Sequence, residues 1–403
     1  MKLWINILCV WIPIPRIRRR LRNKLNQIYF RQHDTPSILY KNACNKPYML
    51  WFDHALGGGT ETYSKRQINK LNNHYEILYI QYKPETRLFH ISRTHNKRHI
   101  YTTPNTDDIK SALKNINADK IIVNNLVGYP NTAEILSTIK HIATTQNKRP
   151  HISVRGHDFQ YICPSFNLIN CDGNYCNLRY KNGCEECWKR KIMDNNATQN
   201  TMLKSCATTI EQWRKNWSDF LEHWADEFIV FSESIKDIFI AAYPNIADKI
   251  IVIPHETQNL RHVNIRPHET INIAILGNIS HQKGATVVCE IAKYISKNEK
   301  IIIIGNMQNA PNNIHIHGKY KTDDLPKLME QYEIDAVFIP SIWPETFSYT
   351  TSEATSMGLP VVCYDLGAPA ERIKQYKHGL VLNEIAPNKN LNEIIEFIKR
   401  VKK

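Results

Sequence analysis

The first part of the sequence lacks both acidic side chains and an apolar run long enough to cross a membrane. No Asp or Glu precedes Asp34, and the apolar run from Leu3 to Ile14 is about half of the ~20 residues that a spanning helix needs. A secretory signal would carry its positive charge before the apolar run and small residues after it, and here this order is reversed. These absences argue against both a spanning helix and an export signal in this segment.

Basic side chains stand where the acids are missing. Of the 52 Lys and Arg residues in this 403-residue chain, which has a net charge of +14, seven lie from Lys2 to Lys24. A short apolar stretch followed by clustered Arg is typical of an anchor on an anionic membrane surface, although a disordered basic tail fits the same composition. We expect residues 1–44 to hold a cytoplasmic protein on the inner face of the cytoplasmic membrane. We expect no nucleic-acid partner, because an aromatic-plus-basic RNA signature is missing from the rest of the sequence.

The body of the sequence alternates apolar strands with helical stretches. Strands are expected at residues 48–54, 75–82, 120–127 and 151–158 in the first half and at residues 271–280, 300–306, 335–341 and 360–367 in the second. This alternation predicts an α/β fold with two doubly wound Rossmann-like domains of parallel strands, over residues 45–256 and 257–403, that face each other across a cleft. Ligands of such sheets bind beyond the carboxyl ends of the strands.

A turn that contains glycine follows the first strand of each half. The residues from Gly57 to Gly59 precede a helix whose free N–H groups can receive an anion. The third glycine of the dinucleotide-binding pattern is missing, so a tight turn without a ligand fits equally well. In the second half Lys283 stands beside Gly284 at another helix start, where it either neutralises phosphate or is a solvated surface residue.

Two carboxylates, Glu345 and Glu353, bracket a polar loop after the strand at residues 335–341. A carboxylate accepts hydrogen bonds from a pair of sugar hydroxyls, so Glu353 can bind a ribose and Glu345 a second sugar, with loop amides facing a diphosphate between them. Two exposed Glu residues that merely solvate a helix start are the alternative. No Asp-x-Asp follows a strand, so we expect catalysis to require no metal or other cofactor, with the diphosphate charge stabilised by Lys283 and N–H groups.

Taken in this order, the motifs resemble those of the retaining glycosyltransferases of the GT-B fold, family 4, over residues 48–390. The segment "PETFSYTTSEA" corresponds to the E-x7-E element of that family, "GNISHQKG" to its Gly-Arg…Lys-Gly element, "GGGTE" to its first glycine loop and "RGHD" to its donor-side His. A subgroup from bacterial surface-polysaccharide clusters is similar in having a Cys-rich insert after the His-Asp pair and a basic leader.

The resemblance implies roles for the matching residues. Lys283 would stabilise the diphosphate leaving group, Glu345 would contact the donor sugar, and His157 would approach that sugar near the reacting centre. A buried strand-end histidine bonded to backbone is the alternative for His157. The implied donor-binding residues are Gly58, Gly59, Gly277, Asn278, Lys283, Thr346, Phe347, Ser348, Tyr349, Thr350 and Glu353.

The sequence departs from the family at three of these positions. Asn278 stands where the family has an Arg, so one phosphate-binding charge is missing. Thr346 and Ser348 stand where the family has glycines around Phe347. Backbone contacts to the donor can survive these changes, but the preferred donor sugar can differ.

The Cys-rich insert at residues 163–187 contains five of the ten cysteines. In a reducing compartment clustered cysteines indicate a metal site rather than disulfides. The pair Cys184 and Cys187 has the spacing of half a zinc site, and Cys163 with Cys176 would complete four ligands, which match the subgroup pattern. Structural zinc is therefore a possible cofactor, and a set of free thiols that pack a loop is the alternative.

These expectations converge on a glycosyltransferase. It would move a sugar from a nucleotide-diphosphate donor to a lipid-linked or glycan acceptor of a cell-surface polysaccharide, such as lipopolysaccharide or capsule. Retention of configuration is implied by the resemblance alone. The alternative is a catalytically silent GT-B-like scaffold that binds a nucleotide sugar or a glycan, which Asn278 favours, and a sugar-nucleotide epimerase is a weaker third hypothesis.

Overall fold

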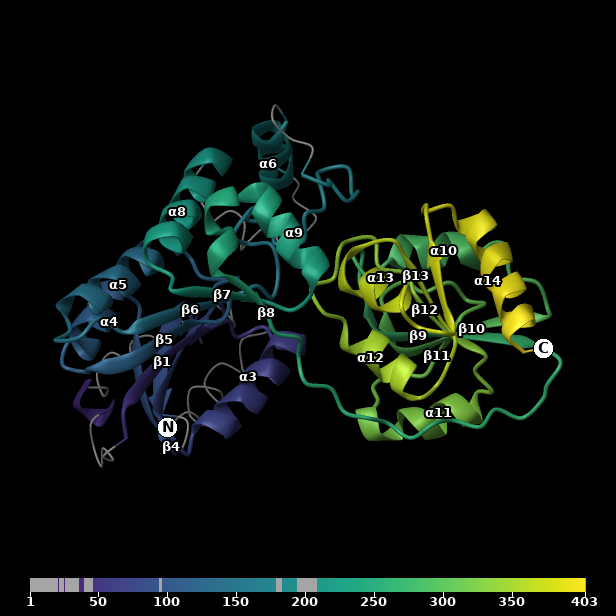
Figure 1. Cartoon of the computed structure of the whole chain (residues 1–403), viewed down its shortest axis with the longest axis horizontal. Coiled ribbons are helices and arrows are strands. Elements are labelled where there is room, and N and C mark those ends of the chain that lie inside the picture. The colour runs from purple at the N-terminus through teal and green to yellow at the C-terminus, as the bar shows by residue number, and fades with distance from the viewer. Residues whose placement is uncertain are drawn as a thin grey trace. The chain divides into compact units, whose positions relative to one another are not determined.

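The computed structural model describes residues 46–93, 96–178, 183–193 and 209–402, with the short helix η1 (Pro36–Leu39) and single positions at 21 and 25. The predicted leader therefore lies almost entirely outside the described residues. Among those that are described, no helix is both long enough and apolar enough to cross a bilayer. The chain divides into two compact units (Figure 1): Met1–Phe166, Lys191–Ile229 and Asn245–Ile250 form the first, and Asn167–Arg190, Val230–Pro244 and Ile251–Lys403 form the second.

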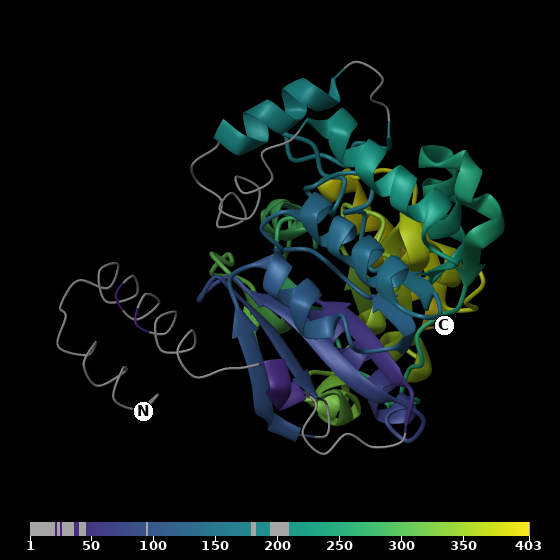
Figure 2. The ribbon, with the colours of Figure 1, turned by 90° about the vertical axis from the view of Figure 1, so that its left-hand side faces the viewer.

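The first unit is built on one sheet, whose described strands are ordered β4-β3-β2-β1-β5-β6-β7-β8. Its strands β1 to β6 lie side by side in purple and blue in Figure 2. Strand β1 pairs in parallel with both β2 and β5, and β6 and β7 extend the parallel part. The strands are β1 (Tyr48–Asp53), β2 (Glu76–Lys83), β3 (Leu88–Arg93), β4 (Asn96–Thr103), β5 (Ala118–Val123), β6 (His151–Arg155), β7 (Glu227–Val230) and β8 (Ile250–Val252).

The helices of this half of the chain follow the strands in the expected alternation. They are α3 (Gly58–Leu71), α4 (Thr106–Leu113), α5 (Thr132–Thr145), α6 (Cys184–Met193), α8 (Ile210–His223), α9 (Glu233–Ala242) and the short η2 (Pro244–Lys249). Helix α5 begins at a capped end, because Asn131 accepts a hydrogen bond from the backbone N–H of Glu134. The helical stretches expected between the strands are therefore present.

One edge of the first sheet is antiparallel, which the alternation of strands and helices does not predict. Strand β3 runs antiparallel to β2, with Lys83 opposite Leu88, and β4 runs antiparallel to β3. A turn at residues 84–87 connects β2 directly to β3 without a helix. Parallel neighbours need a crossover connection, whereas antiparallel strands can be joined by such a short turn. The first sheet is therefore mixed.

The second unit is built on a sheet whose described strands are all parallel and are ordered β11-β10-β9-β12-β13-β14. Numbered by their place in the chain, this is the 3-2-1-4-5-6 order of doubly wound nucleotide-binding folds. The predicted α/β fold with Rossmann-like parallel sheets is confirmed. The strands are β9 (Ile271–Ile279), β10 (Glu299–Met307), β11 (His315–Ile316), β12 (Ala336–Ile339), β13 (Val361–Tyr364) and β14 (Gly379–Leu382); the helices are α10 (Ala285–Ala292), η3 (Thr322–Asp324), α11 (Leu325–Gln331), α12 (Tyr349–Ser356), α13 (Gly367–Ile373) and α14 (Pro387–Val401).

Both faces of the second sheet are buried. Ile273 and Ile275 of β9 belong to one hydrophobic cluster, and Ala274 and Leu276 belong to another. Because successive side chains of a strand point to opposite faces, these two clusters cover the two sides of the sheet. A strand that is buried on both sides is apolar throughout its length, which explains the continuous apolar runs in the sequence.

The start of the Cys-rich insert packs on this second unit. Ile169 is 5% exposed and lies within the cluster that includes Ile273 and Val287. Tyr175, which forms an antiparallel bridge with Ile169, packs against the same cluster. Residues 167–190 accordingly group with the second unit, although the chain enters the insert from the first.

Candidate functional site

The first strand of the second unit ends at a loop that needs glycine. Gly284 precedes α10 with a φ of 88°, and a Cβ at this position would lie 2.1 Å from the carbonyl oxygen of Pro340. Gly305 of β10 must also be glycine, because a Cβ at this position would lie 1.9 Å from the carbonyl oxygen of Gly277 on β9. The carboxyl ends of these strands therefore approach one another more closely than side chains permit.

Lys283 and Glu345 form an ion pair in which the Nζ atom of Lys283 lies 2.6 Å from an Oε atom of Glu345. The side chain of Glu345 is 4% exposed and that of Lys283 is 35% exposed. The hydroxyl of Ser341 donates to the other carboxylate oxygen. Burial raises the pKa of Glu345, but the charge and hydrogen bond of Lys283 outweigh burial, and the net pKa is below the usual value. Two residues that are 62 positions apart in the chain thus form one neutral, buried pair.

The loop after β12 is held in place by Arg372 of α13, a residue that the sequence analysis does not identify. Its guanidinium donates to the carbonyl of Ser348 at 2.9 Å and to the carbonyl of Phe347, and it lies 4.6 Å from the centre of the Phe347 ring. It also donates to the hydroxyl of Ser352. Burial lowers the pKa of Arg372 to about 10, so it remains a cation at neutral pH.

Ser348 adopts a backbone conformation that normally requires glycine. Its φ is 65° and it stands at the N-terminal end of α12. Non-glycine residues in such a conformation are uncommon and cost of order 1–3 kcal/mol, so neighbouring contacts must hold it. The hydroxyl of Thr351 donates to the Ser348 hydroxyl at 3.0 Å. The resembled family has a glycine at this position. In this chain a serine adopts the same positive φ that a glycine would.

Glu353 lies on α12, apart from the Lys283–Glu345 pair. One of its carboxylate oxygens accepts from the hydroxyl of Thr322 at 3.4 Å. Burial raises the pKa of Tyr320, and the carboxylate of Glu353 raises it further, so the Tyr320 phenol stays protonated. On the neighbouring strands Asn278 accepts a hydrogen bond of 3.2 Å from the side chain of Asn306. Asn278 therefore adds no positive charge to this edge.

His255 is a second residue that the sequence analysis does not identify. It is buried, and its ring stacks on Phe347 with 4.5 Å between the ring centres. The ring of Phe231 meets it edge-on at 4.0 Å, and Tyr349 lies 5.2 Å away. His255 thus packs behind the same loop that Arg372 holds by its carbonyls. A single histidine after Pro254, outside any recognised motif, carries no sequence signal for this role.

In the first unit, His157 is linked to the end of β1 through Asn124. The Nε2 atom of His157 lies 3.0 Å from the side-chain oxygen of Asn124, and the side-chain NH₂ of Asn124 donates to Asp53 at 3.0 Å. Since an amide oxygen only accepts, the Nε2 atom carries the proton. The side chains of Ser64 and Tyr79 donate to the other oxygen of Asp53 at 2.5 and 2.7 Å. The carboxyl ends of β1, β5 and β6 therefore share one buried polar network.

Asp158, which follows His157 in the chain, has hydrogen-bond partners of its own. It accepts from the side chain of Asn125 at 2.7 Å and from the backbone N–H of Gln160 at 2.8 Å. Burial raises the pKa of Asp158 to about 6. A carboxyl group with such a pKa changes its charge within a unit or so of neutral pH, at the same strand end as His157.

The glycine turn before α3 has two residues that need glycine by their backbone conformation. Gly57 has a φ of 83° and Gly58, the first residue of α3, has a φ of 80°. A Cβ on Gly58 would meet no atom within 4 Å, so the conformation and not crowding selects glycine there. Gly59 has no left-handed φ, and its predicted role stays a prediction.

The four cysteines predicted to bind zinc do not form a metal site as they stand. Over the described residues, which include all four, no group of three or more His, Cys, Asp or Glu side chains is placed to hold a metal ion. None of these four cysteines takes part in a disulfide, and the backbone N–H of Cys171 donates to the sulfur of Cys187 at 3.2 Å. Zinc binding by these four cysteines stays a prediction.

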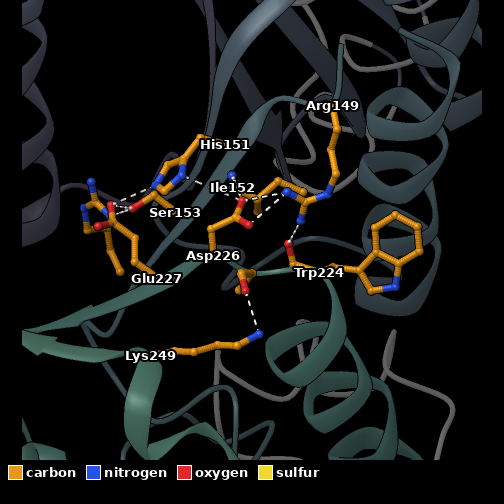
Figure 3. Close-up of polar contacts among 10 residues, drawn as sticks. Arg149, His151, Ile152, Ser153, Trp224, Asp226, Glu227 and Lys249 are labelled. Atoms are coloured by element: carbon orange, nitrogen blue, oxygen red, sulfur yellow. Dashed lines mark hydrogen bonds and ion pairs between the residues drawn. The ribbon is translucent and has the colours of Figure 1, made fainter. Parts of the chain in front are cut away.

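A different charged cluster lies at the opposite, amino-terminal ends of β6 and β7 (Figure 3). Asp226 accepts from a guanidinium N–H of Arg149 at 2.8 Å and from the backbone N–H of Ile152 at 2.7 Å. Lys249 donates to the carbonyl of Ala225 at 2.9 Å. These contacts tie chain segments together at the edge where parallel α/β sheets do not bind ligands. We therefore assign them a structural role.

The strand order of the second unit is that of doubly wound α/β folds, whose ligands bind beyond the carboxyl ends of the strands. Residues 256–403 match the family model described as Glycosyl transferases group 1. No curated protein matches the chain.

Solved glycosyltransferase structures of the GT-B fold share the architecture. Anabaena HepE in complex with UDP-glucose is 15% identical, with a TM-score of 0.53 over 88% of this chain and 90% of that chain. The apo form of the lipopolysaccharide outer core galactosyltransferase WaaB is 13% identical, with a TM-score of 0.56 over 89% and 91%. Sucrose-phosphate synthase from Thermosynechococcus elongatus is 13% identical, with a TM-score of 0.57 over 88% and 90%. At such identities the likeness concerns the fold.

Proposed function

We propose that the protein is a retaining, metal-independent glycosyltransferase of family 4. It transfers a sugar from a nucleotide-diphosphate donor to a lipid-linked or glycan acceptor during the synthesis of a cell-surface polysaccharide. The observation that carries the proposal is the position of Glu345 and Glu353 after β12, at the carboxyl edge of a domain that matches a glycosyltransferase family. The structures of Anabaena HepE in complex with UDP and with UDP-glucose, which share the fold, support a nucleotide-sugar donor.

The chemistry of transfer assigns tasks to the residues at this edge. An acceptor hydroxyl oxygen bonds to the anomeric carbon, the bond from that carbon to the diphosphate breaks, and its electron pair leaves on the diphosphate. The hydroxyl proton passes to the departing diphosphate oxygen. The negative charge is stabilised by the Lys283 ammonium and by the N–H groups at the start of α12.

The Lys283–Glu345 pair affects how this stabilisation works. The pair is neutral, so a diphosphate meets a lysine whose charge is already shared with a buried carboxylate. As negative charge grows on the diphosphate during bond breaking, Lys283 interacts with it more strongly than in the ground state. Such a difference between ground state and transition state is what lowers a barrier. Glu345 meanwhile keeps the lysine charged and in place.

The ribose role of Glu353 provides the test. Calorimetry of UDP binding should show a loss of about 1.5–3 kcal/mol for Glu353→Gln, because hydrogen bonds to a charged acceptor are lost. The matched control is Glu396→Gln, on the exposed face of α14, which should bind UDP like the native protein. Equal affinities for all three proteins would reject the ribose role. UDP binding without turnover of any nucleotide sugar would favour the silent scaffold, which the neutral Asn278 also favours.

Association with a membrane surface is part of the proposal. Deleting residues 1–24 removes the seven basic residues and the apolar stretch. The shortened protein should no longer sediment with vesicles that contain anionic lipid, while its UDP affinity should be unchanged. Continued sedimentation would place the anchor elsewhere in the chain.

A further inference from the structure

The first unit contains a cavity of about 420 Å³ beside α3. Alternate residues of β2, namely Tyr79, Gln81 and Lys83, line one wall, and His90 and Ser92 of β3 continue it. Gln81 is paired with His90 and Tyr79 with Ser92 in the strand register, so these side chains share one face of the sheet. Helix α3 supplies the opposite wall. The cavity volume lies within the ~300–1,000 Å³ range of small-molecule sites.

Among the described residues, three Lys and Arg side chains line the cavity, and two of them have carboxylate partners. Lys65 pairs with Glu61 at 2.6 Å, and Arg93 pairs with Glu76 at 2.7 Å. The ammonium of Lys83 instead donates to the neutral side-chain oxygen of Gln81 at 2.9 Å. Lys83 is therefore the cation whose charge is balanced least by the cavity wall.

The surroundings of Lys83 do not fully compensate its positive charge. Burial lowers the pKa of Lys83, and the carboxylates of Glu85, Glu61 and Asp53 oppose this effect without cancelling it. A cation in this condition gains from an anionic ligand that replaces the lost water.

His54 presents a second donor to the same cavity. The backbone N–H of Leu56 donates to its Nδ1 atom at 3.0 Å, so the ring is neutral and its proton is on Nε2. Burial lowers the pKa of His54, which keeps the ring neutral. The apolar side chains of Ile68 and Ile100 also line the cavity and suit the carbon face of a sugar ring.

We propose that this cavity binds an acidic saccharide, a sugar that carries a carboxylate or a phosphate, with Lys83 and the Nε2–H of His54 holding the anionic group. The assignment deepens the proposed function and rests on it: the saccharide is the acceptor, or the part of the acceptor that selects it. The cavity shares Ser64 and Tyr79 with the buried network of Asp53. That network continues to Asn124 and to His157, the residue that the resemblance places near the donor sugar.

The experiment measures saccharide binding to the full chain by calorimetry, without nucleotide. The probes are glucuronate and glucose 6-phosphate, with glucose as the neutral sugar and inorganic phosphate as the bare anion. At least one of the two acidic sugars should bind at least tenfold more tightly than both glucose and inorganic phosphate. The acid that binds more tightly identifies the anionic group of the natural ligand as a carboxylate or a phosphate.

Substitutions test whether Lys83 provides this preference. Lys83→Met should reduce the affinity for the acidic sugar by roughly tenfold to a hundredfold, because a charge-assisted hydrogen bond is lost, and should change that for glucose little. Lys83→Arg keeps the charge and should retain most of the preference, which also shows that the site tolerates substitution. The control is Lys114→Met, at the exposed end of α4, which should behave like the native protein.

Any of three results would overturn the inference. They are equal affinity for glucose and both acids, a preference that survives in Lys83→Met, or inorganic phosphate bound as tightly as the tighter-binding of the two acidic sugars. Because nucleotide is absent from these titrations, their failure leaves the UDP test of Glu353→Gln unaffected. Failure of that UDP test likewise leaves saccharide binding measurable.

Discussion

Replacing Lys283 by Met would leave a buried carboxylate without its cation, and the structure predicts both the size and the pH dependence of the effect. Glu345 remains buried next to Ser341, with 4% of its side chain exposed. Removing one partner of a buried ion pair costs about 3–5 kcal/mol. Water reaches the 35% exposed Lys283 and already weakens the native pair, so we expect the lower end, about 3 kcal/mol at pH 7.

The pH dependence follows from the pKa of Glu345. In the native protein this pKa is lowered below 4.5, so the pair stabilises the fold above pH 4.5 and the contribution is lost as pH falls through the folded-state pKa. In Lys283→Met the lysine charge and hydrogen bond no longer oppose burial, so the pKa of Glu345 should rise. The carboxyl group of the variant then becomes protonated at a higher pH, so its deficit in unfolding free energy should shrink as pH falls.

Urea denaturation between pH 4.5 and pH 8 measures this deficit. The double variant Lys283→Met with Glu345→Gln removes both charges and should recover much of the stability lost at pH 7. Lys293→Met removes an exposed partner of Glu290 and should leave stability unchanged. A Lys283→Met deficit that is the same at pH 4.5 and pH 8, or a double variant that is no more stable than the single one, would refute the reasoning.

Three further predictions concern single residues. Gly284→Ala should destabilise the protein by more than the ~1–3 kcal/mol of a strained backbone, because the new Cβ would also meet Pro340. The control Gly318→Ala, with a φ of 93° and no atom within 4 Å of its Cβ, should lose only the free energy of backbone strain. Equal losses of stability in thermal melts of the two variants would contradict the crowding at Gly284. The pKa of Asp158, about 6, is raised above 3.8, so the free energy of unfolding should fall as pH rises through this range. Asp158→Asn should flatten this dependence in urea denaturation at several pH values. An unchanged pH dependence would mean that another group causes it. Zinc binding by the insert also stays a prediction. Metal analysis under reducing conditions should find zinc in the native protein and none in Cys184→Ser. A native protein without zinc, whose cysteine thiols react freely with a thiol reagent, would contradict zinc binding.

Local patterns in the sequence predict the second sheet well. Its strands are buried on both sides, so each one is a continuous apolar run that stands out between helices. The sequence analysis does not predict the hairpin β3–β4. A short turn joins β3 directly to β2, and the alternation of strands and helices along the chain does not indicate an antiparallel edge of this kind. The cavity proposed to bind a saccharide lies on this edge.

The sequence predicts which residues belong to the candidate site, but it does not predict which of them contact one another. Lys283, Glu345 and Glu353 follow strands in the sequence, and each lies near the carboxyl edge of the second sheet. That Lys283 pairs with Glu345, while Glu353 accepts from Thr322, depends on which strands are neighbours. Strand neighbours follow from the 3-2-1-4-5-6 order and not from distance along the chain.

The sequence by itself determined the alternation of strands and helices, the positions of the charged residues and the glycines that end strands, because these depend on side-chain chemistry and periods of two to four residues. Only the tertiary structure decided that Arg372 holds the carbonyls of the loop at Phe347, and that Asn124 joins Asp53 to His157. The residues of each of these contacts lie 24 to 71 positions apart. They meet because each is carried to the same edge of a sheet by a different strand or helix, and burial there leaves every polar group in need of a partner.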